Sequence, residues 1–103
     1  MELDIDSYPA AKRKELYSYI RFMEEKGIPE EDTIKVLTGE MTLGFAFGKK
    51  LARKAVQNGF YKDIRWYLSN ASALMPHVEE GIYYFAECWK TATGEDILKL
   101  AYR

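Results

Sequence analysis

The sequence has a single cysteine, Cys88, and no long run of apolar residues. One thiol cannot form an internal disulfide, so we expect a reducing, cytoplasmic setting. No apolar run approaches the roughly 20 residues that a membrane-spanning helix needs, which argues against a membrane protein. The first residues are acidic, without the basic and then apolar pattern of a secretory signal, so no such signal is expected.

Side-chain amides are also scarce, with only Gln57, Asn58 and Asn70 among 103 residues. Because lysine and glutamate are plentiful, this composition is typical of heat-adapted proteins. Hydrophobic residues make up 48% of the chain and charged residues 30%, which indicates a folded protein. The length predicts one domain over residues 1–103, and a net charge of −1 gives no general attraction to nucleic acid.

No segment alternates apolar and polar residues in the manner of a strand, so the sequence predicts an all-α fold. The clearest element is a helical hairpin around a turn at Gly59, because glycine readily adopts the conformation that closes a helix. Its second helix is expected to end at Pro76, which cannot continue a helix. Apolar residues recur at steps of three and four on both sides of the turn. They are Gly48, Leu51, Ala52, Ala55 and Val56 before it, and Ile64, Tyr67, Leu68, Ala71 and Leu74 after it.

Weaker copies of the hairpin flank the central one. Gly27, Gly59 and Gly94 each separate a longer predicted helix from a shorter one, at intervals in the low thirties of residues. Such a period with two helices per unit is typical of stacked hairpin arrays. We expect hairpins at about 8–41, 42–75 and 76–103. The core residues predicted for the flanking hairpins are Leu16, Tyr19, Ile20, Met23, Ile34, Leu37, Met41, Val78, Ile82, Phe85, Ala86, Trp89, Ile97, Leu98 and Ala101.

The starts of the first two helices, and the link to the third, can be proposed from local signals. Asp6 or Ser7 is able to cap a first helix over about 8–26. Pro29 is expected to open the second helix, whose first turn is acidic and therefore suits the helix dipole. Gly39 and Gly44 are expected to lie in the link before the third helix.

The central hairpin resembles a tetratricopeptide repeat. The residues that carry the resemblance are Leu51, Ala52, Gly59, Tyr61, Leu68, Ala71 and Pro76. The chain departs from that pattern at Gly48 and Ala55, where the family prefers large aromatic residues, and at Ile64, where it prefers alanine. The resemblance implies three antiparallel hairpins stacked as a short α-α superhelix, and a protein-interaction module without catalysis. A compact bundle of five or six helices is the alternative.

Few residues suggest chemistry. His77 and Cys88 are the only residues of their kinds and fall about three turns apart in one predicted helix, roughly 16 Å along its axis. That separation prevents contact between a nucleophile and its base. We expect His77 to start the helix and Cys88 to be a small core or boundary residue. No metal-ligand spacing and no glycine-rich loop is found, so the sequence predicts no enzyme activity, metal or cofactor.

Charge is distributed unevenly along the chain. From residue 41 to residue 62 every charged residue is basic, while the segments on both sides are acidic. Like charges one helical turn apart repel by about 0.2–0.5 kcal/mol per pair, so we expect them to be solvated or neutralised. Acidic residues of the neighbouring hairpin (Glu24, Glu25, Glu31), an acidic protein, a second copy and nucleic acid are the candidates. We call Lys49, Lys50, Arg53 and Lys54 the basic row; Lys62 follows it in the sequence.

Two aromatic residues fall away from the apolar stripes of their own helices. Trp66 lies nearly opposite the stripe of its helix, and Tyr84 lies similarly in the next long helix. They are expected either to pack against a neighbouring hairpin or to form an exposed contact for a partner, since Trp and Tyr are common interface anchors.

These observations predict a non-enzymatic protein–protein interaction module that binds a protein partner or itself, with a homodimer as the expected self-association. Its expected partner-binding residues are Trp66, Tyr84 and the basic row. The alternative is a small nucleic-acid-binding protein that uses the basic row together with Arg65.

Overall fold

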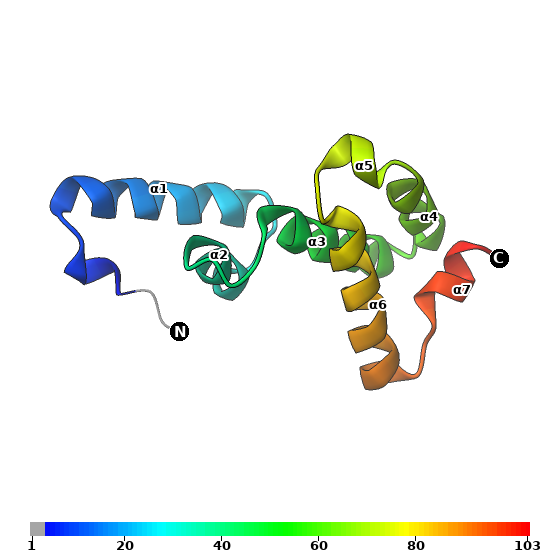
Figure 1. The fold of residues 1–103 in the computed structure, drawn as a ribbon. Helices are drawn as coiled ribbons and strands as arrows, with labels where there is room; N and C mark the ends of the chain where they lie inside the picture. Colours follow the sequence, from blue (N-terminus) through cyan, green and yellow to red (C-terminus); the bar gives the residue numbers. More distant parts are fainter. Residues whose placement is uncertain (1–3) are drawn as a thin grey trace. The chain divides into compact units, whose positions relative to one another are not determined.

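The computed structural model describes residues 4–103, and within this range every regular element is helical, as predicted (Figure 1). Contacts between residues group into two units. The first ends at Thr42 and the second spans Leu43–Arg103. Each unit has its own helices and its own buried residues and is described by itself.

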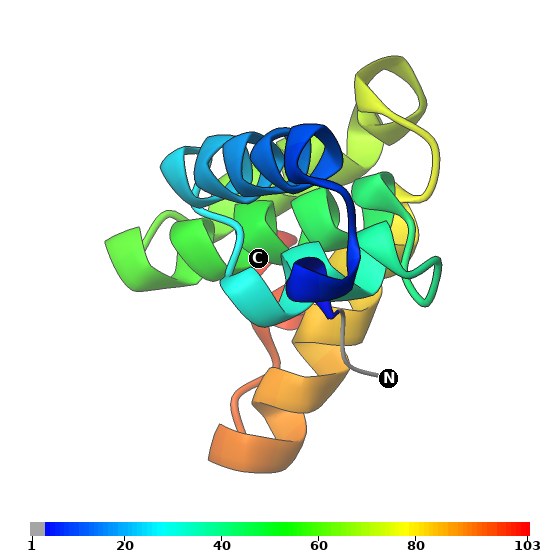
Figure 2. The same cartoon turned by 90° about the vertical axis from the view of Figure 1, so that its left-hand side faces the viewer.

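The first unit is built on two helices, α1 (Ala10–Glu25) and α2 (Glu30–Leu37), which pack against each other (Figures 1 and 2). The turn between them contains Gly27 with a φ of 83°, the left-handed conformation that was expected there. The predicted core residues Leu16, Ile20 and Met23 are buried on one side of α1.

The predicted cap of α1 is wrong. Asp6 and Ser7 instead belong to a short 3-10 helix, η1 (Ile5–Ser7), in which the Ser7 hydroxyl donates a hydrogen bond to the Asp4 carbonyl oxygen at 2.7 Å. Pro9 occupies the cap position of α1 without a side-chain hydrogen bond. A residue that precedes proline is pushed to extended backbone, so Tyr8, with a ψ of 153°, cannot start the helix.

The second helix starts where the sequence predicted, directly after Pro29 and with Glu30, Glu31 and Asp32 in its first turn. Its predicted core was only partly right, because Ile34, Leu37 and Met41 are half-buried. The buried residues of this region lie earlier in the chain. They are Ile28, Asp32 and Thr33.

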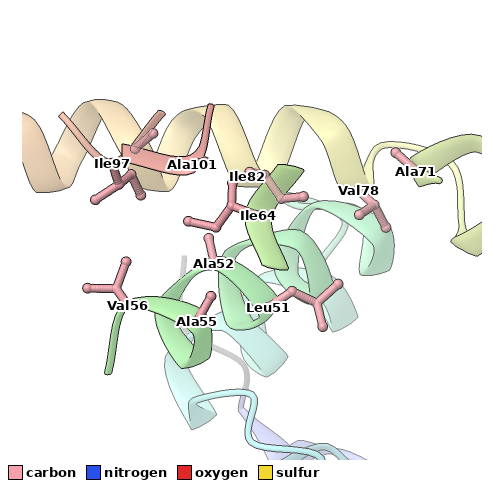
Figure 3. Close-up of a cluster of buried hydrophobic side chains, with 11 residues drawn as sticks. Leu51, Ala52, Ala55, Val56, Ile64, Ala71, Val78, Ile82, Ile97 and Ala101 are labelled. Carbon is pink, nitrogen blue, oxygen red and sulfur yellow. The ribbon is translucent and has the colours of Figure 1, made fainter. Parts of the chain in front are cut away.

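The second unit contains α3 (Leu43–Asn58), α4 (Tyr61–Ser69), α5 (Ala71–Leu74), α6 (Val78–Thr93) and α7 (Ile97–Ala101). Helix α3 packs most extensively against α6, and α4 packs against α7 and α3. One buried cluster joins these helices and includes most residues predicted from the stripes (Figure 3). Its members are Leu51, Ala52, Ala55, Val56, Ile64, Ala71, Val78, Ile82, Ala86, Ile97 and Ala101.

Glycine allows α3 and α6 to pack backbone against backbone. A β-carbon on Gly44 would overlap the Pro76 carbonyl oxygen, and one on Gly81 would lie 2.1 Å from the Phe45 carbonyl oxygen. Gly44 is therefore part of the buried face of α3, and its predicted place in the preceding link is wrong. Only glycine lets the two helices come this close.

The helix after Gly59 is shorter than predicted. It ends at Ser69, and the separate turn α5 follows. The side chain of Asn70 donates a hydrogen bond to the Trp66 carbonyl oxygen at 2.8 Å, while its backbone has a φ of −113°. Such side-chain bonds compete with the helix's own hydrogen bonds, which accounts for the break. Leu74, predicted to be buried, is exposed as a result.

The C-terminal part agrees with the prediction, except that Phe85, Trp89 and Leu98 are only partly buried against the cluster. Helix α6 closes at Gly94, whose φ is 78°, and α7 buries Ile97 and Ala101. Glu95, in the link between them, accepts hydrogen bonds from the Tyr61 hydroxyl at 3.0 Å and from the Trp89 indole nitrogen at 3.2 Å. One carboxylate thus connects the start of α4 with the end of α6.

Candidate interaction surfaces

The basic row lies on α3, on the part of the helix that the buried cluster leaves accessible. Lys54 is exposed, and the other three residues of the row are half-buried. Two of them lie over aromatic rings. The Lys49 ammonium is 5.5 Å from the centre of the Tyr84 ring, and the Lys50 ammonium is 5.3 Å from that of Phe47. Each ammonium therefore lies over the face of a ring, and the stems of these lysines cover apolar surface.

Tyr84 combines the two predicted roles. Its ring packs against Phe45 of α3 with 5.2 Å between ring centres, yet half of the residue is exposed. The structure thus places Tyr84 beside Lys49 of the basic row. These two sequence-predicted residues, from α6 and α3, form one continuous aromatic and basic surface.

Trp66 lies on the exposed side of α4, with 57% of its surface accessible. The ring of Tyr67 meets the Trp66 ring edge-on, with 5.8 Å between ring centres. Burial raises the pKa of the Tyr67 hydroxyl, and the carboxylate of Asp63 adds to this effect. Trp66 therefore keeps more than half of its surface accessible on the outer side of α4.

His77 and Cys88 show no joint site. His77 starts α6 as predicted, with its Nδ1 atom 3.2 Å from a Glu80 carboxylate oxygen. Cys88 is exposed, and its predicted core or boundary position is wrong, because it falls beside the apolar stripe on the solvent side of α6. Within residues 4–103 no three histidine, cysteine or acidic side chains come together as metal ligands would.

A groove of about 620 Å³ lies along α1 and was not predicted from the sequence. It is lined by residues on the side of the helix that faces away from Leu16, Ile20 and Met23. Exposed Tyr17 and Phe22 supply its apolar part, and the Lys26 ammonium lies 5.3 Å from the centre of the Phe22 ring. The charged lining residues are Asp6, Arg13, Lys14, Arg21 and Glu25.

A second aromatic surface was also missed, on the outer side of α6. Tyr83 is 43% exposed. Partial burial raises the pKa of its hydroxyl, and the neighbouring Glu79 and Tyr102 raise it further. Tyr83 also lines a shallow hollow next to Glu87 and the link to α7. The signal available in the sequence was that Tyr17 and Tyr83 fall on the polar sides of their helices.

Comparisons with known proteins add no identification. No family model, curated protein or solved structure matches this chain. The resemblance to a tetratricopeptide repeat therefore stays a prediction. Over the residues that the structure describes, no helix combines the length and the apolar character needed to cross a bilayer.

Proposed function

We propose that this chain is a non-enzymatic protein–protein interaction module that associates with itself. The observation that carries the proposal is the number of large aromatic side chains left exposed on folded helices. They include Tyr17, Phe22, Trp66, Tyr83 and Tyr84. Aromatic residues are enriched at the centres of protein interfaces, where they gain most from leaving water.

Trp66 and Tyr84 are the proposed anchors of this function, with the basic row as an adjoining charged surface. Both rings are held by an aromatic neighbour, so little side-chain freedom is lost when a partner covers them. Protein interfaces combine such rings with a polar rim that excludes water and sets specificity. The proposed self-association takes place in the cytoplasm and requires no cofactor.

Light scattering tests the proposal with Trp66→Ala as the variant and Phe60→Ala as the control. Phe60 is 61% exposed at the start of α4, which makes it a matched loss of aromatic surface. We expect Trp66→Ala to weaken assembly at least about tenfold, the effect of a residue worth ~1.4 kcal/mol in the interface. Phe60→Ala should assemble as the unaltered chain does. If both variants assemble equally well, Trp66 is not part of the interface.

Nucleic-acid binding through the basic row is the second candidate. One observation favours it, namely that all four cations of the row keep accessible surface on one helix beside the exposed ring of Tyr84. Retention on a heparin or RNA column that falls steeply with salt would support this function. A chain that passes such a column unretained at low salt would contradict it.

A further inference from the structure

The exposed side of α1 has a regular order of charge and aromatic residue. Arg13, Tyr17 and Arg21 follow one another at steps of four, which places them on one side of the helix, and we call them the basic stripe. Tyr17 is 54% exposed, and all three side chains line the groove along α1. Neither arginine forms an ion pair with another residue in the described range 4–103.

The exposed side of α6 has the same order with the opposite charge. Glu79, Tyr83 and Glu87 also follow at steps of four, and we call them the acidic stripe. Both carboxylates are exposed, and neither has an ion-pair partner among the residues that the structure describes. Glu80 lies beside this stripe but is engaged by His77.

We propose that the basic stripe of one copy of this chain docks against the acidic stripe of a second copy. The inference rests on the proposed self-association and adds a pair of surfaces to it, beside the contacts of Trp66 and Tyr84. In each stripe a tyrosine is flanked by two like charges at equal spacing. When two such helices lie alongside each other, tyrosine meets tyrosine and each arginine meets a glutamate. The symmetric order permits this match for parallel and antiparallel helices.

Charge complementarity selects a second copy as the occupant. Like charges two turns apart on each helix gain nothing from one another, and the facing helix supplies the opposite sign for both. Two exposed tyrosines give the contact an apolar centre with a charged rim, the usual arrangement of an interface. The groove beside the basic stripe offers room for the facing side chains, with Lys14 adding to its positive charge and Asp6 and Glu25 reducing it.

Because the two stripes are different surfaces, each copy carries one of each. Two copies can satisfy both by exchanging contacts reciprocally, which gives a closed homodimer, or successive copies can continue head to tail. Either assembly uses the same pair of stripes. Either one is weakened by salt, since the attracting charges lie at an exposed rim.

Charge reversal tests the pairing directly. Arg13→Glu/Arg21→Glu makes both stripes acidic, and Glu79→Arg/Glu87→Arg makes both basic. We expect each variant alone to dissociate at least about tenfold more readily than the unaltered chain, by light scattering at low salt. Mixed in equal amounts, the two variants should assemble again, since each then offers the other a stripe of opposite sign.

The control is Lys35→Glu/Lys99→Glu, which reverses two exposed cations outside both stripes. It changes the net charge as much as the arginine variant does and should leave assembly unchanged. If the unaltered chain assembles and the reversed variants do so equally well, this pairing is wrong while the proposed function stands. If the unaltered chain is monomeric at low salt, both are wrong. If the chain stays monomeric and binds heparin, and Arg13→Glu/Arg21→Glu abolishes that binding, then the basic stripe binds a polyanion and not a second copy.

Discussion

Gly48 of α3 and Val78 of α6 lie so close that a β-carbon on the glycine would be 2.1 Å from the Val78 carbonyl oxygen. No real β-carbon tolerates that distance, so any side chain at position 48 must push the two helices apart. The same contact brings Ala52 and Ile82 into the buried cluster. The packing of α3 against α6 therefore requires a residue without a side chain at position 48.

We predict that Gly48→Ala destabilises the protein by on the order of 3 kcal/mol, the upper range for overpacking a rigid contact. Urea unfolding followed by circular dichroism measures the loss. Gly39→Ala is the matched control, because a β-carbon there meets nothing within 4 Å and only the φ of 81° is unfavourable. Its cost should be about 1–2 kcal/mol, from the left-handed conformation alone. Equal costs for the two variants would contradict the close contact.

The hydrogen bond to Glu95 leads to a prediction about Tyr61. That hydrogen bond, together with burial and the carboxylate's negative charge, raises the pKa of the Tyr61 hydroxyl above its usual 10.0. We expect Glu95→Ala to return the pKa toward that value, as measured by the pH dependence of the tyrosine ring signals in NMR. Glu80→Ala, which removes an exposed carboxylate elsewhere, should leave the Tyr61 pKa raised. A Tyr61 pKa that is the same with and without Glu95 would contradict the bond.

The sign of the linked pH effect follows from the same shift. A group whose pKa is higher in the folded state holds its proton longer there, so its contribution to stability is complete below about pH 10. That contribution is lost as the pH rises through the folded-state pKa. Tyr61→Phe should therefore make unfolding less sensitive to pH above 10. An unchanged pH dependence in Tyr61→Phe would show that Tyr61 does not carry the effect.

His77 is the one residue other than glycine, within the described range, with a positive φ, 72°. Side chains branched at the β-carbon fit this conformation worst, so His77→Val should destabilise the protein by about 1–2 kcal/mol. His77→Gly should cost less, because glycine adopts the conformation freely. Thermal unfolding of the two variants measures the difference. Greater stability of the valine variant would contradict a left-handed backbone at this position.

The all-helical fold and the positions of the turns could be predicted from the sequence, because they depend on residues that are close together in the chain. Gly27, Gly59 and Gly94 all close helices with positive φ, and Pro29 precedes a helix as expected. The break at Asn70 was missed, since a side-chain hydrogen bond there outweighs a continuous apolar pattern. The role of Gly44 was missed because its partner, Pro76, is distant in the sequence.

The interaction surfaces were only partly predictable. Trp66 and Tyr84 stood out because they oppose the apolar stripes of their helices, and both are exposed. Tyr17 and Tyr83 each fall between two like charges at steps of four, a pattern as regular as that of Trp66 and Tyr84. Whether such a tyrosine is exposed depends on which side of its helix the core covers. Periodicity defines an apolar side, and only the packing shows which polar sides remain uncovered.

Self-association is the central claim, and the mass of the unaltered chain in solution tests it most directly. Light scattering over a concentration series up to about 1 mM detects even an association of roughly −4 kcal/mol. We predict a mass that rises above the 12.0 kDa of one chain and falls again as salt is added. A mass of 12.0 kDa at every concentration, at low salt, would contradict the account.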